Sequence, residues 1–330
     1  MEQVFFINPV AGKRDASAEL VPQIQAAARQ LQLPQPQIVV TQYAGQAREA
    51  ARRYAASGTP AALYACGGDG TLNELVQGAA GSANVAVGCV PCGSGNDYVR
   101  NFGAAGQAPF LDFAAQLQAQ PCRVDLLQTS LGIGIDICAA GLDAQVAYGI
   151  PKFRRLPGCG GTAAYTLSIL QAMLSRFGHK LRVAIDGKEY TGTYMMAAIC
   201  NGGYYGGGYQ AAPYAAMDDG LLDIVLVKPI SRIQVAGILA KYKAGQHMQD
   251  ADTIVPEFRS FMTFYRARSV EMQVLDNRPI IATIDGECAP VMELKAEVLP
   301  SALNVLLPRP ACGSAVIRVL HECPMQAKAK

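Results

Sequence analysis

Over the first 125 residues, short apolar segments alternate with segments of helical spacing. The apolar segments are 4–8, 37–41, 60–67 and 85–91, and the helical segments are 16–33, 46–56 and 72–80. This order predicts βαβ units, in which helices cover both faces of a parallel sheet. Ligands of such sheets bind beyond the carboxyl ends of the strands. We therefore expect an α/β domain whose ligand site lies at that edge.

The chain after about residue 126 is rich in β-type segments that are joined by turn residues. Two helical segments interrupt them, at 162–177 and 233–243, and the second has Ser231 as its N-cap and Gly245 just past its end. Many strands separated by turn residues indicate an antiparallel β-sandwich. This part of the chain is therefore predicted to form a separate domain.

The length of 330 residues suffices for about two domains, and a hydrophobic content of 51% excludes global disorder. We predict an α/β domain over 1–125, rejoined by part of 305–330, and a β-sandwich over 126–304. The chain is thus expected to combine a parallel sheet with an antiparallel one.

Charge and targeting signals exclude several functional classes. The formal net charge is +2, whereas nucleic-acid binders usually carry a strongly basic domain. The N-terminal segment lacks the basic and apolar regions of a signal peptide, and no apolar stretch reaches the ~18 residues of a membrane helix. We expect a cytoplasmic protein with no transmembrane segment and no nucleic-acid partner. Peripheral membrane association and a homodimer remain open.

Ten cysteines in a chain without a secretion signal are expected to be reduced thiols. Cys89 and Cys92 have the spacing of metal ligands, but the sequence holds no second pair of this spacing to complete a zinc site. We therefore interpret the cysteines as small buried apolar residues.

The segment Gly67-Gly68-Asp69-Gly70-Thr71 directly follows an apolar strand and precedes a helix. Its glycines allow a sharp turn and a close approach of the backbone to a ligand, and the free amides at the helix start form an anion site. It is not a Walker A loop, because no Lys-Ser/Thr pair follows. A bare carboxylate would repel phosphates, so Asp69 is expected to partner a metal ion, a ribose or a proton. The alternative is an ordinary Gly-rich turn.

Two similar turns follow the first and the fourth predicted strands. They are Asn8-Pro9-Val10-Ala11-Gly12-Lys13 and Pro91-Cys92-Gly93-Ser94-Gly95-Asn96-Asp97. All three turns are expected at the carboxyl edge of the sheet, where ligands bind. Their small residues and polar side chains together predict a site for nucleotide phosphates.

Six motifs occur in order between about residues 2 and 309: NPVAGK, GGDGTLNE, PCGSGNDYVR, GLDAQVA, AAMDDGLLDIVLV and IDGE. With this order and spacing, the chain resembles the diacylglycerol-kinase-type lipid kinases, a bacterial family related to the sphingosine and ceramide kinases. GGDGT alone is less specific, because NAD kinases also carry it. The resemblance implies an α/β nucleotide domain and a β-sandwich acceptor domain, with the active site in the cleft between them.

For the nucleotide, the resemblance implies that the Gly-rich turns and the end of the second strand contact ATP. The residues concerned are Asn8, Pro9, Val10, Ala11, Gly12, Lys13, Thr41, Gly67, Gly68, Asp69, Gly70, Thr71, Leu72, Asn73, Glu74, Ser94, Gly95 and Asn96. Ala11 stands where the family commonly has Ser, which removes one hydroxyl donor, and Ser94 stands where Thr is common. We expect neither difference to remove catalysis.

For catalysis, the resemblance implies that Glu287 is the general base, which takes the proton of the lipid hydroxyl. Asp69 and Asp97 match acidic residues of the catalytic cleft and are expected to position Mg²⁺–ATP or the acceptor. Without the resemblance, the segment around Glu287 is a simple hairpin turn with a solvated carboxylate.

The resemblance also implies a structural Mg²⁺ site in the turn that contains Met217-Asp218-Asp219-Gly220. The carboxylate of Asp219 and the carbonyls of Ala216 and Leu221 would be its ligands, together with waters. A plain turn leading into the next strand explains the same segment and is compatible with the metal site.

The expected activity is transfer of the γ-phosphoryl group of Mg²⁺–ATP to a lipid hydroxyl, with diacylglycerol as the first acceptor and phosphatidic acid as the product. A sphingoid-like or an isoprenoid alcohol could replace diacylglycerol as the acceptor. The sequence also leaves open an NAD kinase, which the GSGND turn and the DGE motif disfavour, and a non-catalytic lipid- or nucleotide-binding regulator. The presence of Asp69, Asp97 and Glu287 argues weakly against the regulator.

Two segments are candidates for contact with the membrane surface, where the lipid substrate lies. Residues 152–156 mix basic and apolar side chains in a loop flanked by Pro and Gly, and residues 201–214 place tyrosines and glycines in a mobile loop. Such mixtures can dock on an anionic headgroup layer. The alternative for both is a solvated loop.

Overall fold

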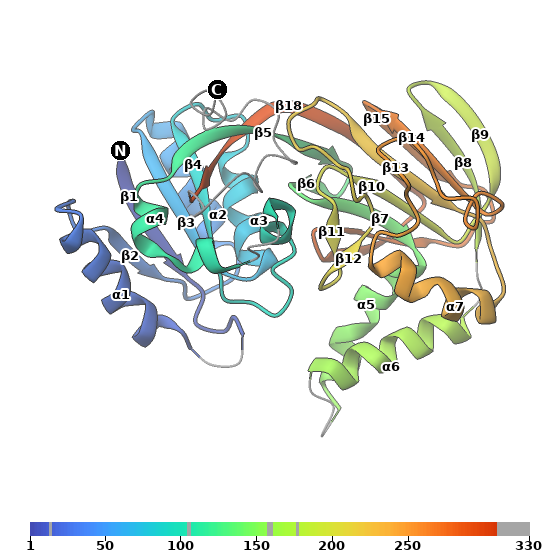
Figure 1. The fold of residues 1–330 in the computed structure, drawn as a ribbon, viewed down its shortest axis with the longest axis horizontal. Helices are drawn as coiled ribbons and strands as arrows, with labels where there is room; N and C mark the ends of the chain where they lie inside the picture. The colour runs from blue at the N-terminus through green and yellow to red at the C-terminus, as the bar shows by residue number, and fades with distance from the viewer. Residues whose placement is uncertain (13–14, 104–106, 157–160, 176–177, 309–330) are drawn as a thin grey trace. The chain divides into compact units, whose positions relative to one another are not determined.

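The structure is a computed structural model and describes residues 1–308 except 13–14, 104–106, 157–160 and 176–177 (Figure 1). Lys13 and the tail after Pro310 lie outside the described residues. The chain divides into two compact units. The first contains Met1–Leu126, Ala216–Gly220 and the chain from Leu299 onward, and the second contains Leu127–Ala215 and Leu221–Val298. The sequence had assigned the residues 216–220 and 299–304 to the second domain.

A parallel sheet forms the centre of the first unit. Its order is β2-β1-β3-β4, and the end of β18 pairs with β4 as an additional parallel strand. Every residue of β3 and β4 is buried, as expected for parallel strands between two helical layers. The strands are β1 (Glu2–Ile7), β2 (Gln37–Val40), β3 (Ala61–Gly67), β4 (Val85–Pro91) and β18 (Glu293–Leu307).

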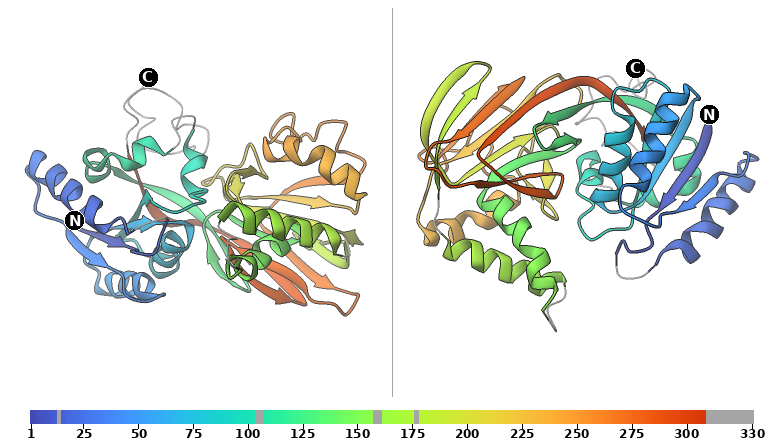
Figure 2. Two further views of the ribbon diagram at one scale, coloured as in Figure 1. Left: turned by 90° about the horizontal axis from the view of Figure 1, so that it is seen from below. Right: turned by 180° about the vertical axis from the view of Figure 1, so that it is seen from behind.

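Helices cover both faces of this sheet (Figure 2). The connection from β1 to β2 and the connection from β2 to β3 run in opposite directions across the sheet. Because such crossovers are right-handed, α1 and α2 lie on opposite faces. Phe5 and Ile7 of β1 pack with Ile24 of α1 and Phe113 of α4 in one apolar cluster, whereas α2 packs on α3. The helices are α1 (Ser17–Gln30), α2 (Gln46–Ser57), α3 (Asp69–Ala79) and α4 (Phe113–Leu117), with short 3₁₀ turns η1 (Tyr98–Phe102) and η2 (Ala108–Leu111).

Helix α3 begins at Asp69, three residues before the predicted start at Leu72. Gly68 is its N-cap residue, in an extended conformation and without a side-chain cap. From the sequence, the glycines are expected to form a turn that precedes the helix. The first helical turn instead consists of Asp69, Gly70 and Thr71, so the motif itself forms the N-terminus of the helix.

Two antiparallel sheets form the second unit. One has the order β14-β13-β10-β7-β16-β17, and in the other the first half of β18 pairs with β15, followed by β8 and β9. The strands are β7 (Ile137–Gly141), β8 (His179–Ile185), β9 (Lys188–Tyr194), β10 (Met196–Cys200), β13 (Leu222–Val227), β14 (Met262–Ala267), β15 (Ser269–Val274), β16 (Ile280–Ile284) and β17 (Glu287–Val291). Strands β5 (Gln120–Thr129) and β6 (Gly132–Gly134) pair with each other, and β5 also pairs with β18.

The core of the second unit lies between these two sheets. Val183 and Val270 from one sheet and Ile199 and Ile224 from the other belong to a single buried cluster. The opposite face of the six-stranded sheet is covered by a second cluster, to which Tyr242 of α7 contributes. The predicted combination of an α/β unit and a β-sandwich is therefore confirmed.

The helices of the second unit are α5 (Leu142–Arg154), α6 (Gly161–Leu174) and α7 (Arg232–Lys243). The start of α7 is as predicted: Ser231 accepts a hydrogen bond from the amide of Gln234, whose side chain returns the bond in a capping box. Among the described residues, no helix combines the length and the apolar character needed to cross a membrane.

Helix α5 was not predicted, and the loop assigned to residues 152–156 is wrong. Lys152, Phe153 and Arg154 form the last turn of α5, which continues through Pro151. Pro and Gly near this segment suggested a loop, but Gly149 has a packing role instead, because a Cβ there would lie 2.3 Å from Ser168 Oγ of α6. Contact with α6 therefore outweighs the weak helix propensity of this sequence.

The segment from residue 201 to 214, expected to be a mobile loop, contains a small hairpin. Its strands are β11 (Tyr204–Tyr205) and β12 (Tyr209–Gln210), which pair antiparallel. The Tyr205 hydroxyl lies 3.2 Å from that of Tyr242, so one tyrosine of this segment turns inward onto α7.

The cysteines are largely as expected. Cys66, Cys89, Cys138 and Cys200 are buried free thiols, and burial raises the pKa of Cys66 and of Cys200 above the ordinary value. Neutral thiols of this kind behave as small apolar side chains. Cys122, in contrast, is disulfide-bonded, so the expectation of reduced thiols is wrong at that position.

Candidate functional site

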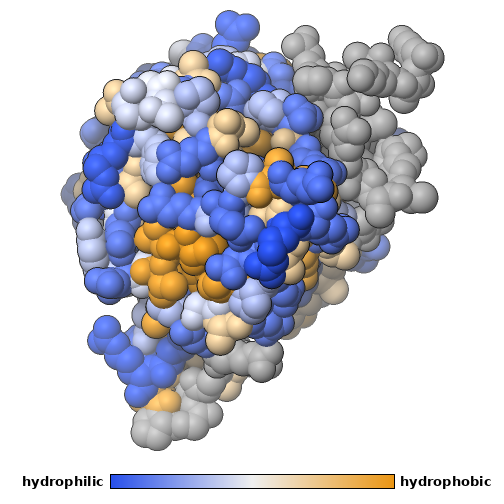
Figure 3. All heavy atoms as spheres, turned by 90° about the vertical axis from the view of Figure 1, so that its left-hand side faces the viewer, coloured by the Kyte–Doolittle hydropathy of each residue, from blue (hydrophilic) through white to orange (hydrophobic). Residues whose placement is uncertain are grey.

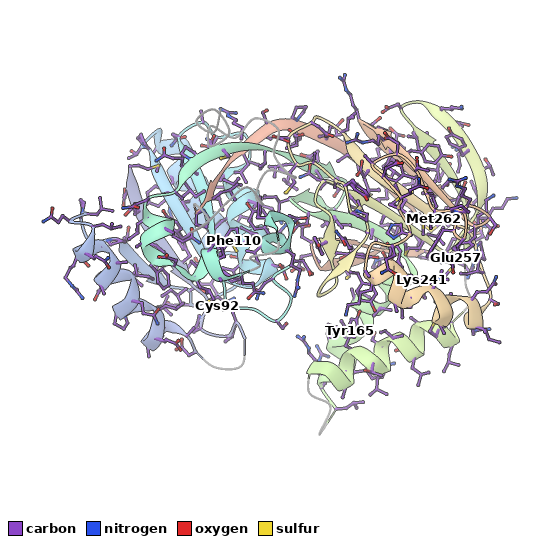
Figure 4. The ribbon with its side chains drawn as sticks, viewed as in Figure 1. Cys92, Phe110, Tyr165, Lys241, Glu257 and Met262 are labelled. Carbon is purple, nitrogen blue, oxygen red and sulfur yellow. The ribbon has the colours of Figure 1, made fainter. Side chains whose placement is uncertain are left out.

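The three Gly-rich turns meet at the carboxyl edge of the parallel sheet in the first unit. The amides of Cys92 and Gly93 donate to the carbonyl of Gly67 at 2.8 and 3.2 Å, which joins the turn after β4 to the end of β3. The Asn8 side chain donates from Nδ2 to Thr71 Oγ1 at 3.1 Å, which joins the turn after β1 to α3. Figure 4 shows Cys92 on the loop that follows β4. The structure therefore brings together the turns that the sequence grouped.

The close approach of these turns requires glycine. A Cβ at Gly93 would lie 2.4 Å from Gly68 Cα, and a Cβ at Gly12, which has φ +79°, would lie 2.5 Å from the carbonyl oxygen of Cys92. Contacts this short with backbone atoms cannot be relieved by a side-chain rotation. The glycines thus allow three backbone segments to pack at one edge.

Both carboxylate oxygens of Asp69 accept hydrogen bonds from the turn after β4. Its Oδ2 accepts from the amide of Asn96 at 2.9 Å, and its Oδ1 accepts from the amide of Asp97 at 2.8 Å. The space for Asp69 exists because residue 95 is glycine, where a Cβ would lie 2.5 Å from Asp69 Oδ2. Asp69 therefore connects the turn after β4 to the start of α3. Both segments are candidates for phosphate binding.

The turn after β4 is also closed by its own side chains. The Asn96 amide group accepts from the amide of Gly93 at 3.0 Å and donates to the carbonyl of Gly93 at 2.9 Å, with Asn96 itself at φ 52°. Asp97 is buried and lies 3.4 Å from Arg100 Nε. Ser94 is exposed at the tip of the turn, so its hydroxyl is accessible to a ligand.

The N-terminus of α3 opens at this edge and suits an anion. Gly70 is exposed in the first turn, and the amides of Thr71 and Leu72 already bond to the carbonyl of Gly68. The first amides of a helix carry a partial positive charge, which favours phosphate. A helix start, three glycine-lined turns and an exposed hydroxyl are the parts that a triphosphate site needs.

Several residues that the resemblance assigned to ATP have other observed contacts. Leu72 is buried, and Asn73 accepts a hydrogen bond from Gln77. Glu74 accepts from the amides of Gly45 and Ala47 at 2.7 and 3.2 Å, so its carboxylate caps the start of α2. These side chains hold the helices that surround the turns.

Two more of the predicted nucleotide residues are placed by backbone contacts. Thr41, at the end of β2, bonds back to the carbonyl of Ile7 through its amide at 2.8 Å. Val10 donates from its amide to Asn8 Oδ1 at 3.1 Å, which shapes the first turn together with Pro9 and Ala11. Lys13 lies outside the described residues.

The turn from Ala216 to Gly220 is tied to the first unit by Asp125, a residue that the sequence analysis missed. Asp125 Oδ2 accepts from the amide of Gly220 at 2.7 Å, and its Oδ1 accepts from the amide of Ser301 at 2.6 Å. Burial raises the pKa of the Asp125 carboxyl, and the charges of Asp219 and Asp218 raise it further. An excess of carboxylates around one turn suits a cation with oxygen ligands.

No group of three or more His, Cys, Asp or Glu side chains arranged for a metal ion occurs within the part of the chain that the structure describes. A site built from one carboxylate, backbone carbonyls and waters does not need such a group. The expected donors at Asp219, Ala216 and Leu221 are of this kind.

In the second unit, the DGE motif is a hairpin turn between β16 and β17. Ile284 pairs with Glu287, and the two residues of the turn, Asp285 and Gly286, have φ 45° and 95°, as a tight two-residue hairpin requires. Glu287 is exposed at the start of β17. The hairpin interpretation is therefore correct for the backbone, and it leaves the Glu287 carboxylate accessible.

Asp285 anchors this hairpin, a role that the sequence analysis did not assign. Its Oδ2 accepts from the amide of Ile135 at 2.7 Å, and its Oδ1 accepts from the amides of Asp136 and Ile137 at 3.1 and 3.0 Å. Three such bonds to one carboxylate hold the turn firmly. The position of Glu287 is thereby fixed relative to β7.

Asp143, in the GLDA motif, is a half-buried acid at the start of α5, and its Oδ2 atom is buried. Its Oδ1 accepts from the amide of Ala144 at 2.8 Å, while its Oδ2 has no accessible surface. Burial raises the pKa of the Asp143 carboxyl to about 7, and the bond from the Ala144 amide only partly offsets this effect. The sequence shows that an aspartate is present, but it does not show the burial that favours the protonated carboxyl.

The Asp143 carboxyl should give the protein a pH-dependent stability. The folded state keeps the proton up to about pH 7 and the unfolded state only up to about pH 4, so stability falls as the pH rises through this interval. In Asp143→Asn, this loss is absent. We expect the difference in unfolding free energy between variant and wild type to grow by about 4 kcal/mol from pH 4 to 8. Urea titrations measure it, and a constant difference would contradict the buried acid.

A groove of about 410 Å³ in the first unit is not part of this site. Val4, Phe6 and Val39 form its floor, and Glu2 and Thr59 line it near the amino ends of β1 and β3. Figure 3 shows one face of the first unit. Most of this face is hydrophilic, but it carries an apolar patch. The groove lies between α2 and the strands β1 and β2, and no residue of the Gly-rich turns lines it.

Two family models match the chain. The diacylglycerol kinase catalytic domain matches residues 2–129, and the YegS C-terminal NAD kinase beta sandwich-like domain matches residues 136–307. The second match alone spans more than half of the chain.

Curated relatives agree with these matches. A Shewanella frigidimarina protein named as a probable YegS-like lipid kinase is 30% identical over 76% of this chain and 77% of its own length. A Pseudomonas aeruginosa protein of the same name is 29% identical over 94% and 90%, and a Bacillus subtilis diacylglycerol kinase is 24% identical over 75% and 78%.

A solved structure shares the fold. A crystal structure of a diacylglycerol kinase from Bacillus anthracis superimposes with a TM-score of 0.65 and covers 94% of this chain and 97% of its own, at 19% identity. The match of both domains, in order and over nearly the whole described chain, identifies this protein as a lipid kinase of the bacterial diacylglycerol-kinase-type, YegS-like family.

Proposed function

We propose that this lipid kinase transfers the γ-phosphoryl group of Mg²⁺–ATP to the hydroxyl of diacylglycerol and so forms phosphatidic acid. The observation that carries the proposal is the meeting of three Gly-rich turns with the start of α3. Phosphoryl transfer depends mainly on positioning and on neutralising charge. Backbone amides at a helix start do both for a triphosphate, because they point at the ligand with a fixed dipole.

The triphosphate would lie against Gly68, Gly70 and the tip of the turn at Ser94. The Ser94 hydroxyl and the first amides of α3 would donate to phosphate oxygens. Asp69 would act indirectly, by keeping the amides of residues 96 and 97 in place through its two hydrogen bonds. Asp97, which lies beside Arg100, would orient the nucleotide or its metal.

Glu287 would take the proton of the acceptor hydroxyl as the phosphoryl group is transferred. A carboxylate suits this role, because the alcohol is deprotonated late in a loose transition state. Glu287 is exposed and stands on a hairpin that Asp285 fixes through three backbone amides. The base would therefore be held in place without being buried.

Magnesium, when bound with ATP, neutralises charge on the phosphates. A second, structural magnesium would be held at Asp219 with the carbonyls of Ala216 and Leu221. The protein would act at the cytoplasmic face of a membrane as a peripheral enzyme, because its acceptor is a membrane lipid.

The choice of diacylglycerol rests on relatives that carry this name, and an acceptor screen tests it. Purified enzyme with γ-labelled ATP and Mg²⁺ is offered diacylglycerol, a sphingoid base, an isoprenoid alcohol and NAD in separate assays. We expect label in phosphatidic acid. Label only in a different lipid would show that this lipid, and not diacylglycerol, is the acceptor. Label only in NADP would overturn the lipid kinase proposal.

Replacing Asp219 by alanine tests the structural magnesium. In wild type, millimolar Mg²⁺ should raise the melting temperature, because an ion that binds only the folded state stabilises it. Asp219→Ala should remove most of this Mg²⁺-dependent increase while keeping the hydrogen bonds of Asp125. Thermal melts with and without Mg²⁺ measure the effect, and an unchanged increase in the variant would place the ion elsewhere.

A further inference from the structure

Helix α6 buries a row of small side chains and exposes two of its leucines. Ala164, Ser168 and Ala172 recur every four residues, are buried, and form one face. On this face Ser168 Oγ donates to the carbonyl of Val146 in α5 at 2.5 Å, and Gly149 of α5 leaves room for it. The small residues therefore let α5 and α6 pack closely, and Leu170 and Leu174 are left outside.

The outer face of α6 is apolar and continues onto α7. Leu170 is 55% and Leu174 is 72% exposed, and they lie one turn apart on the helix. Arg232, at the start of α7, donates to the carbonyls of Met173 and Ser175 at 2.6 and 3.1 Å, which places the end of α6 against α7. The next residue, Ile233, is 86% exposed. Water-exposed leucine and isoleucine grouped in this way mark an interaction surface.

The exposed charges of α5 and α6 are all of one sign, and they lie at the end of the helix pair opposite to Leu174, because Ser175, directly after α6, pairs with Gln145 near the start of α5. The sequence from 142 to 175 carries Lys152, Arg154 and Arg155 but a single acid, Asp143. The three basic side chains are exposed in the last turn of α5 and just after it, whereas Asp143 Oδ2 is buried. Helix α6 itself contains no charged residue. No exposed carboxylate of α5 or α6 therefore offsets the positive charge.

Of the two lysines of α7, Lys241 is paired with a carboxylate. Lys241 Nζ lies 2.8 and 2.7 Å from the two carboxylate oxygens of Glu257, and Figure 4 shows the two residues together with Tyr165 on α6. Exposed basic side chains therefore lie at the end of α5 and, with Arg232 and Lys243, on α7.

We propose that this surface docks on the anionic face of a lipid bilayer. We call it the α5–α6 surface and define it by Leu170, Leu174, Ile233, Lys152, Arg154 and Arg155. A helix pair with exposed leucines at one end and exposed lysine and arginine at the other has the two components of a segment that lies in the headgroup region. With 14 residues, α6 is about 21 Å long, which is too short to span the bilayer.

The inference rests on the proposed function, because a kinase for a membrane lipid must reach its acceptor at the bilayer surface. Beyond that function, the inference names the α5–α6 surface as the place of contact and anionic lipids as the preferred headgroups. The leucines would enter the boundary of the acyl chains, while the basic side chains would face the headgroups.

Vesicle sedimentation with the full chain tests the docking surface without requiring catalysis. Wild type should bind vesicles that contain about 30% phosphatidylglycerol more tightly than vesicles of phosphatidylcholine alone, and added salt should weaken this binding. Leu170→Glu/Leu174→Glu should bind at least about tenfold more weakly to both. Arg154→Ser/Arg155→Ser should lose about twentyfold toward the anionic vesicles only.

Leu111→Glu is the matched control, because Leu111 is 45% exposed on the first unit, outside the α5–α6 surface. It should bind as wild type does. Equal binding by Leu170→Glu/Leu174→Glu and wild type would overturn the proposal, and so would wild type that binds neither vesicle. If the leucine variant instead turned a dimer into a monomer with vesicle binding unchanged, the surface would join two copies of the chain.

Turnover separates failure of the docking surface from failure of the proposed function. With a short-chain, water-soluble diacylglycerol, Leu170→Glu/Leu174→Glu should keep wild-type activity, and with diacylglycerol in vesicles it should lose most of it. Equal activity of variant and wild type on vesicles would contradict the docking surface alone. Wild type that phosphorylates neither form of diacylglycerol would contradict the proposed acceptor, whatever the vesicles show.

Discussion

Glu287→Gln should lower kcat by about 10²- to 10⁴-fold while the KM for ATP changes by less than about twofold. Glutamine keeps the size and the exposure of the side chain but cannot accept the proton of the lipid hydroxyl. The fold should be unaffected, because the side chain is exposed and the hairpin is held by Asp285. Initial rates at varied ATP and acceptor measure the effect.

Glu189→Gln is a suitable control for this variant. Glu189 is also an exposed glutamate on a strand of the second unit, in β9, and has no proposed role in catalysis. It should keep wild-type turnover. If Glu287→Gln were as active as wild type with the same melting temperature, Glu287 would not be the base, and the exposed carboxylate would be only a solvated turn residue.

Asp69→Asn should abolish measurable kinase activity through the geometry of the nucleotide site. Asparagine offers one acceptor oxygen, whereas the amides of Asn96 and Asp97 each need one. Its NH₂ group would face one of these amides, donor against donor. The buried amide left without an acceptor costs about 1–3 kcal/mol, so the turn after β4 should move away from α3. Loss of Mg²⁺–ATP binding, measured by calorimetry, should accompany the loss of activity.

Asp112→Asn controls for the general effect of removing a carboxylate from the first unit. Asp112 Oδ1 accepts from the amide of Ala115 at the start of α4, and asparagine serves equally well as an N-cap. This variant should keep both ATP binding and turnover. A fully active Asp69→Asn would show that the Gly-rich turns need no carboxylate clamp and would remove them as the nucleotide site.

Much of the fold could be predicted from the sequence, because hydrophobic periodicity and turn residues are local signals. The strands β1, β3 and β4 and the capped start of α7 are examples. Helix α5 could not be predicted in this way. Its helical state depends on packing Gly149 against Ser168 of α6, and Pro151 obscured it. In α5, tertiary contacts therefore determine the helical conformation of a segment whose own helix propensity is weak.

The same contrast between local signals and tertiary contacts holds for the residues of the candidate site. The glycines were recognisable, because close approach of backbones leaves few other residues possible. The anchoring carboxylates were not. Asp285 bonds to amides about 150 residues earlier, and Asp125 bonds to that of Ser301. The clamp role of Asp69 was hidden for the same reason, since its acceptor bonds go to the turn after β4.

The most direct test of the account is calorimetric titration of a non-hydrolysable ATP analogue, with Mg²⁺, into wild type, Glu287→Gln and Asp69→Asn. The account predicts that wild type and Glu287→Gln bind with Kd values within about twofold of each other, and that Asp69→Asn binds at least about tenfold more weakly. Undiminished binding by Asp69→Asn would contradict it, because the triphosphate would then not depend on the turns that Asp69 holds together.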